Sequence, residues 1–87
     1  MLEIHWTDSS EAHIAEHGVL PREVEQATQR PRYLQPGRAG TTLLYGRTGA
    51  GRYLFVVLTE ALDGRWYVVT AYDMTPAQRR AYNQKAV

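Results

Sequence analysis

Arginine and aromatic side chains occur together through the second half of this 87-residue chain. Guanidinium groups form paired hydrogen bonds with phosphate, and aromatic rings stack on unpaired bases. The combination is typical of surfaces that bind single-stranded RNA. Near predicted strand ends and on the last predicted helix, the residues that could bind RNA in this way are Arg47, Arg52, Arg65, Tyr72, Arg79, Arg80 and Tyr82.

Such a surface would also suit a ribonuclease that needs no metal ion. Arginines would stabilise the charge on the scissile phosphate while a Glu or Tyr side chain moves the proton of the 2′-hydroxyl. The competing interpretation is an ordinary solvated basic surface, with most strand aromatics in the core. We expect Tyr53, Phe55 and Trp66 to be core residues, whereas Tyr82 fits either interpretation.

The net charge of +1 conceals an uneven distribution along the chain. Residues 1–29 carry six acidic residues and one arginine, whereas residues 30–65 carry six arginines and two acidic residues. The chain has no cysteine, which excludes disulfides and thiolate metal sites and is usual for cytosolic proteins. It has neither a long apolar run nor a recognisable signal peptide, so we expect a cytoplasmic protein without a membrane partner.

The interpretation of this protein as a metal-dependent enzyme rests on one weak feature of the sequence. His13 and His17 stand four residues apart, which places them on one face of a predicted helix. No third ligand follows at a fixed spacing, and His17 is explained equally well by its position near the end of that helix. We therefore predict no metal and no cofactor.

The stretch GRTGAGR at residues 46–52 has the composition of a phosphate-binding loop. Such a loop requires a helix after its glycines, so that backbone amides point at the anion. The apolar stretch YLFVVLTE follows instead, and it is typical of a strand. We predict a hairpin turn with a positive φ at Gly49 or Gly51, which holds Arg47 and Arg52 close together.

The elements that position these residues form one α+β domain over residues 1–87. We expect a short strand at residues 2–6, a helix capped by Asp8 and Glu11 that ends at Gly18, and a second helix from Pro21 to about Gln29. Three strands follow, with room for one more short strand before them. They cover residues 41–47, 52–60 and 65–72, and a last helix starts at Thr75 with Gln78 completing its capping box.

The middle strand of the three is apolar on both faces, which predicts a central position in an antiparallel sheet. The expected order therefore places two helices before the sheet and one helix after it. No repeat, low-complexity tract or linker divides the chain.

The chain resembles the BrnT family of ribonuclease toxins, which is related in fold to RelE. The resemblance rests on HW at 5–6, HIAEHGV at 13–19, GRTGAGRYLFVVLTE at 46–60 and VVTAYDMTPAQRRAY at 68–82. These segments span nearly the whole length in the family's order, and the hairpin segment is the most specific of them.

The resemblance implies a toxin that cleaves RNA and is neutralised by an antitoxin protein encoded beside it. The active residues that it implies are Arg47, Arg52, Glu60, Arg79, Arg80 and Tyr82. Two positions depart from the family pattern, since Glu16 replaces a basic residue and Tyr72 replaces an arginine. The alternative is therefore a catalytically silent module that binds a protein or RNA, and the sequence leaves self-association into a homo-oligomer open.

Overall fold

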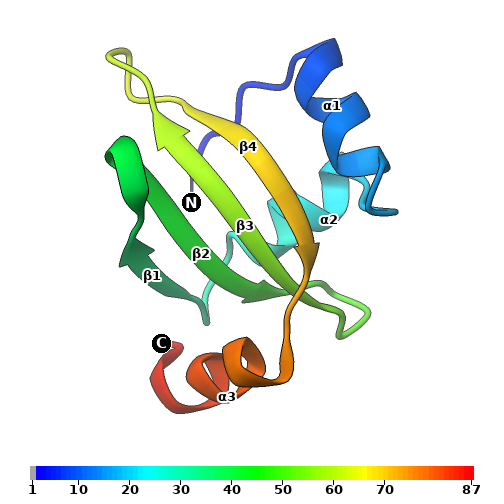
Figure 1. The fold of residues 1–87 in the computed structure, drawn as a ribbon, viewed down its shortest axis with the longest axis vertical. Helices are drawn as coiled ribbons and strands as arrows, with labels where there is room; N and C mark the ends of the chain where they lie inside the picture. The colour runs from blue at the N-terminus through cyan, green and yellow to red at the C-terminus, as the bar shows by residue number, and fades with distance from the viewer. Residues whose placement is uncertain (1) are drawn as a thin grey trace.

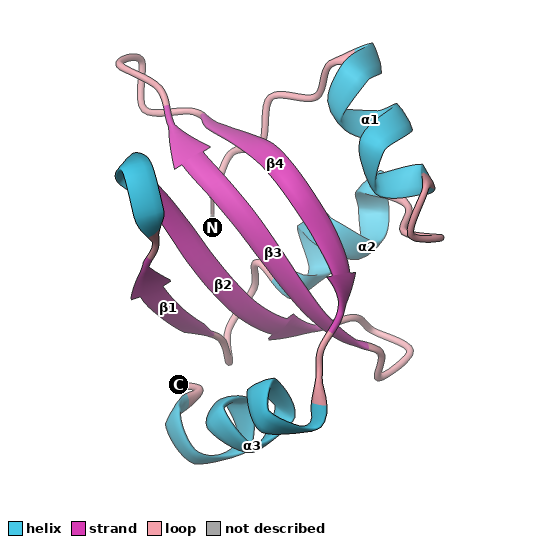
Figure 2. Ribbon diagram, in the orientation of Figure 1, coloured by secondary structure: helices cyan, strands magenta, loops and turns pink. Residues whose placement is uncertain are grey.

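The computed structural model describes residues 2–87 and has an α+β fold (Figures 1 and 2). Two helices precede a four-stranded antiparallel sheet and one helix follows it, as predicted. In chain order the elements are α1 (Asp8–Ala15), α2 (Pro21–Ala27), β1 (Tyr33–Pro36), the short 3₁₀ helix η1 (Arg38–Gly40), β2 (Thr41–Arg47), β3 (Tyr53–Glu60), β4 (Trp66–Asp73) and α3 (Pro76–Lys85).

The strands lie in the order β1-β2-β3-β4, so β3 has a neighbour on each side. The prediction of a central strand is thereby confirmed. The strand occupies this position because both of its faces are apolar. Leu54 and Val56 alternate with Phe55, and all three are buried. A bulge between Val57 and Leu58 leaves Val69 of β4 without a partner in the register.

The two faces of the sheet pack against different helices. On one face, buried residues of β2, β3 and β4 form the main core with Ile14 of α1 and with Val24 and Ala27 of α2. On the other face, a second cluster joins Tyr45 and Phe55 to Tyr82 of α3. Helix α3 lies across one end of this face only, as Figures 1 and 2 show.

The N-terminal segment differs from two sequence-based expectations. Residues 2–6 do not form a strand, because their only pairing is a single parallel bridge between Ile4 and Trp66. The cap of α1 is Thr7 rather than Asp8: its hydroxyl accepts a hydrogen bond from the Ser10 amide at 3.0 Å, and Ser10 Oγ accepts one from the Thr7 amide. Asp8 is instead the first helical residue, where a negative charge suits the helix dipole.

Helix α2 ends at Ala27, two residues earlier than expected, and Thr28 follows as its cap. The turn at Gly18 has the predicted left-handed backbone, with φ of 68°. The additional strand for which the sequence left room is β1, and it pairs with β2.

Helix α3 is held at both of its ends. At the start, the predicted capping box is present: the Gln78 amide donates to Thr75 Oγ1 at 3.2 Å, and the Thr75 amide donates to Gln78 Oε1 at 2.9 Å. Beyond its end, Val87 and Arg32 exchange two backbone hydrogen bonds, each 3.1 Å long. Within residues 2–87, no helix is long and apolar enough to cross a membrane.

Candidate nucleic-acid interface

The glycine-rich stretch is a hairpin turn between β2 and β3, as predicted. The Thr48 amide donates to the Arg52 carbonyl at 2.9 Å, and Gly51 adopts the positive φ of 91° that the turn requires. The Gly49 amide donates to Oε1 of Gln26 at 3.0 Å, so the turn is also attached to the end of α2. The glycines therefore shape a loop and present no helix to an anion.

Arg47 and Arg52 flank this turn, but their side chains lie on opposite faces of the sheet. The expectation that the turn holds them together is therefore wrong for the side chains, although both residues lie at the same end of the sheet. The reason is the register, in which Arg47 pairs with Tyr53 and Arg52 precedes that pair by one residue. Successive residues of a strand point to opposite faces.

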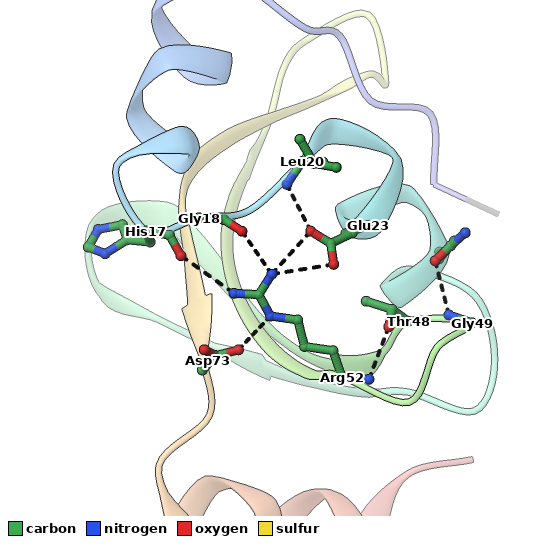
Figure 3. Close-up of polar contacts among 9 residues, drawn as sticks. His17, Gly18, Leu20, Glu23, Thr48, Gly49, Arg52 and Asp73 are labelled. Atoms are coloured by element: carbon green, nitrogen blue, oxygen red, sulfur yellow. Dashed lines mark hydrogen bonds and ion pairs between the residues drawn. The ribbon is translucent and has the colours of Figure 1, made fainter.

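Arg52 connects three separate segments of the chain (Figure 3). Its Nε donates to Asp73 Oδ1 at 2.6 Å, and its Nη1 donates to Glu23 Oε1 at 3.1 Å. Nη1 and Nη2 also donate to the carbonyls of Gly18 and His17, at 2.9 and 3.4 Å. The hydrogen bond to Asp73 is the main cause that raises the pKa of Arg52, and burial acts in the opposite direction. With two carboxylates bound, this guanidinium has little capacity left for a phosphate.

Arg47 and Arg79 lie over the ring of Tyr53. Their guanidinium carbons are 4.5 and 4.3 Å from the ring centroid, which is within the range of a cation–π contact. The edge of the Tyr82 ring meets the same tyrosine, with centroids 5.6 Å apart. Among residues 2–87 neither arginine forms an ion pair with a carboxylate, so both charges remain free for an anionic ligand.

A pocket of about 470 Å³ opens beside this stack, a volume in the range of ligand sites. Arg30 and Arg47 contribute positive charge, and no acidic side chain lines the pocket. The lining comes from the end of α2, the hairpin turn and α3: Gln26, Gln29, Arg30, Pro31, Arg47, Thr48, Gly49, Gly51 and Tyr82. A smaller pocket of about 280 Å³ lies at the same end of the sheet, lined by Gly51, Arg52, Tyr53, Asp73, Met74 and Arg79.

Glu60 and Arg65 do not belong to this site. Glu60 is the last residue of β3, whereas Tyr53 is the first, so seven steps of about 3.3 Å along the strand place them roughly 23 Å apart. Arg65 lies at the Glu60 end, where its Nε donates to Asp63 Oδ2 at 2.9 Å and its Nη1 meets His5 Nδ1 at 2.8 Å.

The remaining predicted residues lie at or near the site. Arg80 is an exposed neighbour of Arg79 on α3. Tyr82 lines the pocket but is only 6% exposed, and its hydroxyl donates to the Pro31 carbonyl at 3.3 Å. Tyr72 is half-buried on β4, and its ring lies 5.2 Å from that of Phe55 and 6.1 Å from that of His17, measured between centroids.

Sequence reasoning missed two groups at this end of the sheet. Gln29 and Arg30 line the larger pocket. The sequence placed the end of the second helix at about Gln29, whereas α2 ends at Ala27, and for that reason the segment after the helix was not considered as part of a site. Asp73 lines the smaller pocket. It is the last residue of β4, and no sequence motif around it indicated a functional role. Tyr53 was expected in the core, yet it is half-buried and contacts both arginines.

Helix α1 ends at Ala15, so His13 lies in the helix and His17 in the turn after it, with ring centroids 6.2 Å apart. No group of three or more His, Cys, Asp or Glu side chains that could hold a metal ion occurs in residues 2–87. Comparison with protein-family models, with curated proteins and with solved structures gives no match for this chain.

Proposed function

We propose that this protein is a metal-independent endoribonuclease of the toxin type, similar to the BrnT family, which binds single-stranded RNA at the hairpin end of the sheet. The observation that carries the proposal is the pair of guanidinium groups over Tyr53, neither of which forms an ion pair within residues 2–87, beside a basic pocket without acidic lining. Arginine and an aromatic face together bind the phosphate and the base of an unpaired nucleotide.

Arg47 and Arg79 have the positions needed to act on a phosphate. During cleavage the phosphate gains negative charge, and a fixed cation stabilises this charge more in the transition state than in the bound substrate. Because both guanidinium groups pack on Tyr53, their positions are set before RNA binds. Arg80, one residue further along α3, would contact the RNA backbone outside the pocket.

The proposal includes a protein partner and a location. A toxin of this type acts on RNA in the cytoplasm and is kept inactive by a cognate antitoxin protein. The free positive charge at the hairpin end, Arg30, Arg47 and Arg79, would suit an acidic segment of such a partner.

Controlled expression in a bacterial host tests the proposed function. Growth arrest with fragmented total RNA is the expected result for the wild-type chain, and Arg79→Ala should relieve both effects. The matched control is Arg38→Ala, which removes the same charge from an exposed residue at the opposite end of the sheet. Normal growth of cells containing abundant folded wild-type protein would contradict the proposal.

Binding of a single-stranded RNA oligonucleotide to the purified protein tests the site itself. Each phosphate contact that is removed should lower the slope of log K against log salt by about 0.7. We expect this change for Arg47→Ala and for Arg79→Ala, and no change for Arg38→Ala. Equal slopes in all three variants would place the RNA elsewhere.

A specific observation favours the second candidate, a silent module that binds RNA or a protein without cleaving RNA. Neither proton carrier implied by the resemblance is free at the site, because Glu60 lies at the far end of β3 and the Tyr82 hydroxyl is bound to Pro31. For this candidate, the purified protein should bind RNA and leave it intact in the presence of a metal chelator.

A further inference from the structure

The proposed reaction needs a group that accepts the proton of the ribose 2′-hydroxyl. Such a group must reach the sugar next to the phosphate that the arginines bind. Tyr53 and Arg79 share the wall of the smaller pocket with one carboxylate, that of Asp73. The backbone next to Asp73 is attached to Tyr53, because the amide of Met74 donates to the Tyr53 carbonyl at 3.1 Å.

The carboxylate of Asp73 is held by one oxygen and open at the other. Oδ1 accepts the 2.6 Å hydrogen bond from Arg52, whereas Oδ2 has no hydrogen-bond partner within residues 2–87. The side chain is 66% exposed, so a substrate can reach Oδ2. Arg52 is fixed in turn by Glu23 and by the Gly18 carbonyl, and it therefore sets the direction of the Asp73 carboxylate (Figure 3).

We infer that Asp73 binds the ribose 2′-hydroxyl of single-stranded RNA and accepts its proton, and that Arg52 is the positioning residue for this carboxylate. The inference rests on the proposed function and supplies the proton acceptor that Glu60 and Tyr82 do not. The same contact gives a reason to prefer RNA, since DNA has no 2′-hydroxyl to donate.

The reaction step is balanced without a cofactor. The 2′-hydroxyl proton moves to Asp73 Oδ2, the 2′-oxygen forms a bond to phosphorus, and the bond from phosphorus to the 5′-oxygen breaks. The leaving 5′-oxygen takes a proton from solvent, which gives a 2′,3′-cyclic phosphate and a 5′-hydroxyl. Asp73 then releases its proton to solvent, and Arg79, which lines the same pocket, stabilises the charge on the phosphate throughout.

Three amide substitutions test the catalytic role in the purified full chain, with a metal chelator present. Asp73→Asn keeps an oxygen for Arg52 but presents an NH₂ group in place of Oδ2. Asp63→Asn is the matched control, because Asp63 forms the other aspartate–arginine pair at the opposite end of the sheet. Glu60→Gln tests the carboxylate that the resemblance implies. Thermal unfolding of each variant checks that it is folded.

We expect Asp73→Asn to lower kcat for cleavage of an RNA oligonucleotide by about 10²–10⁴-fold. KM should rise by no more than the roughly tenfold loss of the ribose contact. Asp63→Asn and Glu60→Gln should cleave like the wild type. Wild-type cleavage by Asp73→Asn would overturn the inference, and so would a loss of cleavage confined to Glu60→Gln.

A binding measurement tests the ribose contact independently of cleavage. The wild-type protein should bind an RNA oligonucleotide roughly tenfold more tightly than DNA of the same sequence, and Asp73→Asn should remove this preference. Equal wild-type affinities for RNA and DNA would overturn the ribose contact. A wild-type protein that binds RNA but leaves it uncut would instead overturn the proposed nuclease function and the proton transfer, while the RNA-to-DNA ratio still decides the contact.

Discussion

Gly46 of β2 packs directly against the carbonyl oxygen of Ala27, the last residue of α2, and a β carbon at this position would overlap that oxygen. The contact joins the sheet to the helix whose end carries the lining of the larger pocket. Gly46 is buried, so neither backbone can move aside without opening the core.

Gly46→Ala should therefore lower the free energy of unfolding by about 1–3 kcal/mol, the usual cost of forcing extra volume into a packed core. Urea denaturation measures this loss. The control is Gly49→Ala in the neighbouring turn, where a β carbon would meet Gln26 no closer than 3.6 Å and where φ is not positive. Equal stability of the two variants would show that α2 can shift away from β2.

Arg52→Ala should lower the free energy of unfolding by about 2 kcal/mol, because it leaves Glu23 and Asp73 without their partner. Arg65→Ala removes an arginine that is more exposed and pairs with one carboxylate only, so the loss should be smaller. Chemical denaturation of the two variants under the same conditions compares them. A larger loss for Arg65→Ala would refute the view that Arg52 is the main polar connection between segments.

The stability of the protein should fall in acid partly through Asp63. The Arg65 backbone amide, and then the Arg65 side chain, hold the pKa of Asp63 below its usual range. A carboxylate with a lowered folded-state pKa stabilises the fold above its unfolded-state pKa of about 3.9, and this contribution disappears as the pH falls through the lowered value.

Asp63→Asn should consequently flatten the pH dependence of the unfolding free energy in this acidic window and leave the pH dependence near neutrality unchanged. Denaturation curves collected at a series of pH values provide the measurement. A wild-type slope that the substitution leaves unaltered would mean that other carboxylates account for it.

The fold could be predicted because its signals are local. Thr75 and Gln78 form a capping box within one turn of helix, and the double apolar pattern of β3 marks a central strand without reference to any other segment. The prediction of a strand at residues 2–6 was wrong because it relied on local signals alone. These residues have strand character, but they pair with β4 only through the single bridge between Ile4 and Trp66.

The site was harder to predict because it depends on contacts between distant residues. Arg52 and Asp73 are 21 residues apart in the sequence, and no motif near either residue predicts that they form a pair. The face on which each arginine lies depends on the register of the β2–β3 hairpin, which the residue types of the turn do not determine. The sequence predicts Arg79 as part of a basic and aromatic group, whereas its contact with Tyr53 depends on the packing of α3.

The attachment of α3 at both ends has a consequence for the thermodynamics of association. Thr75 fixes one end of the helix and the Arg32–Val87 backbone pair fixes the other. Arg79 and Arg80 therefore lie on a helix that is ordered before any ligand binds. The conformational entropy of ordering this helix is lost when the chain folds, not when a ligand arrives. A partner that meets the helix therefore incurs little additional ordering cost, which favours tight binding by a small contact area.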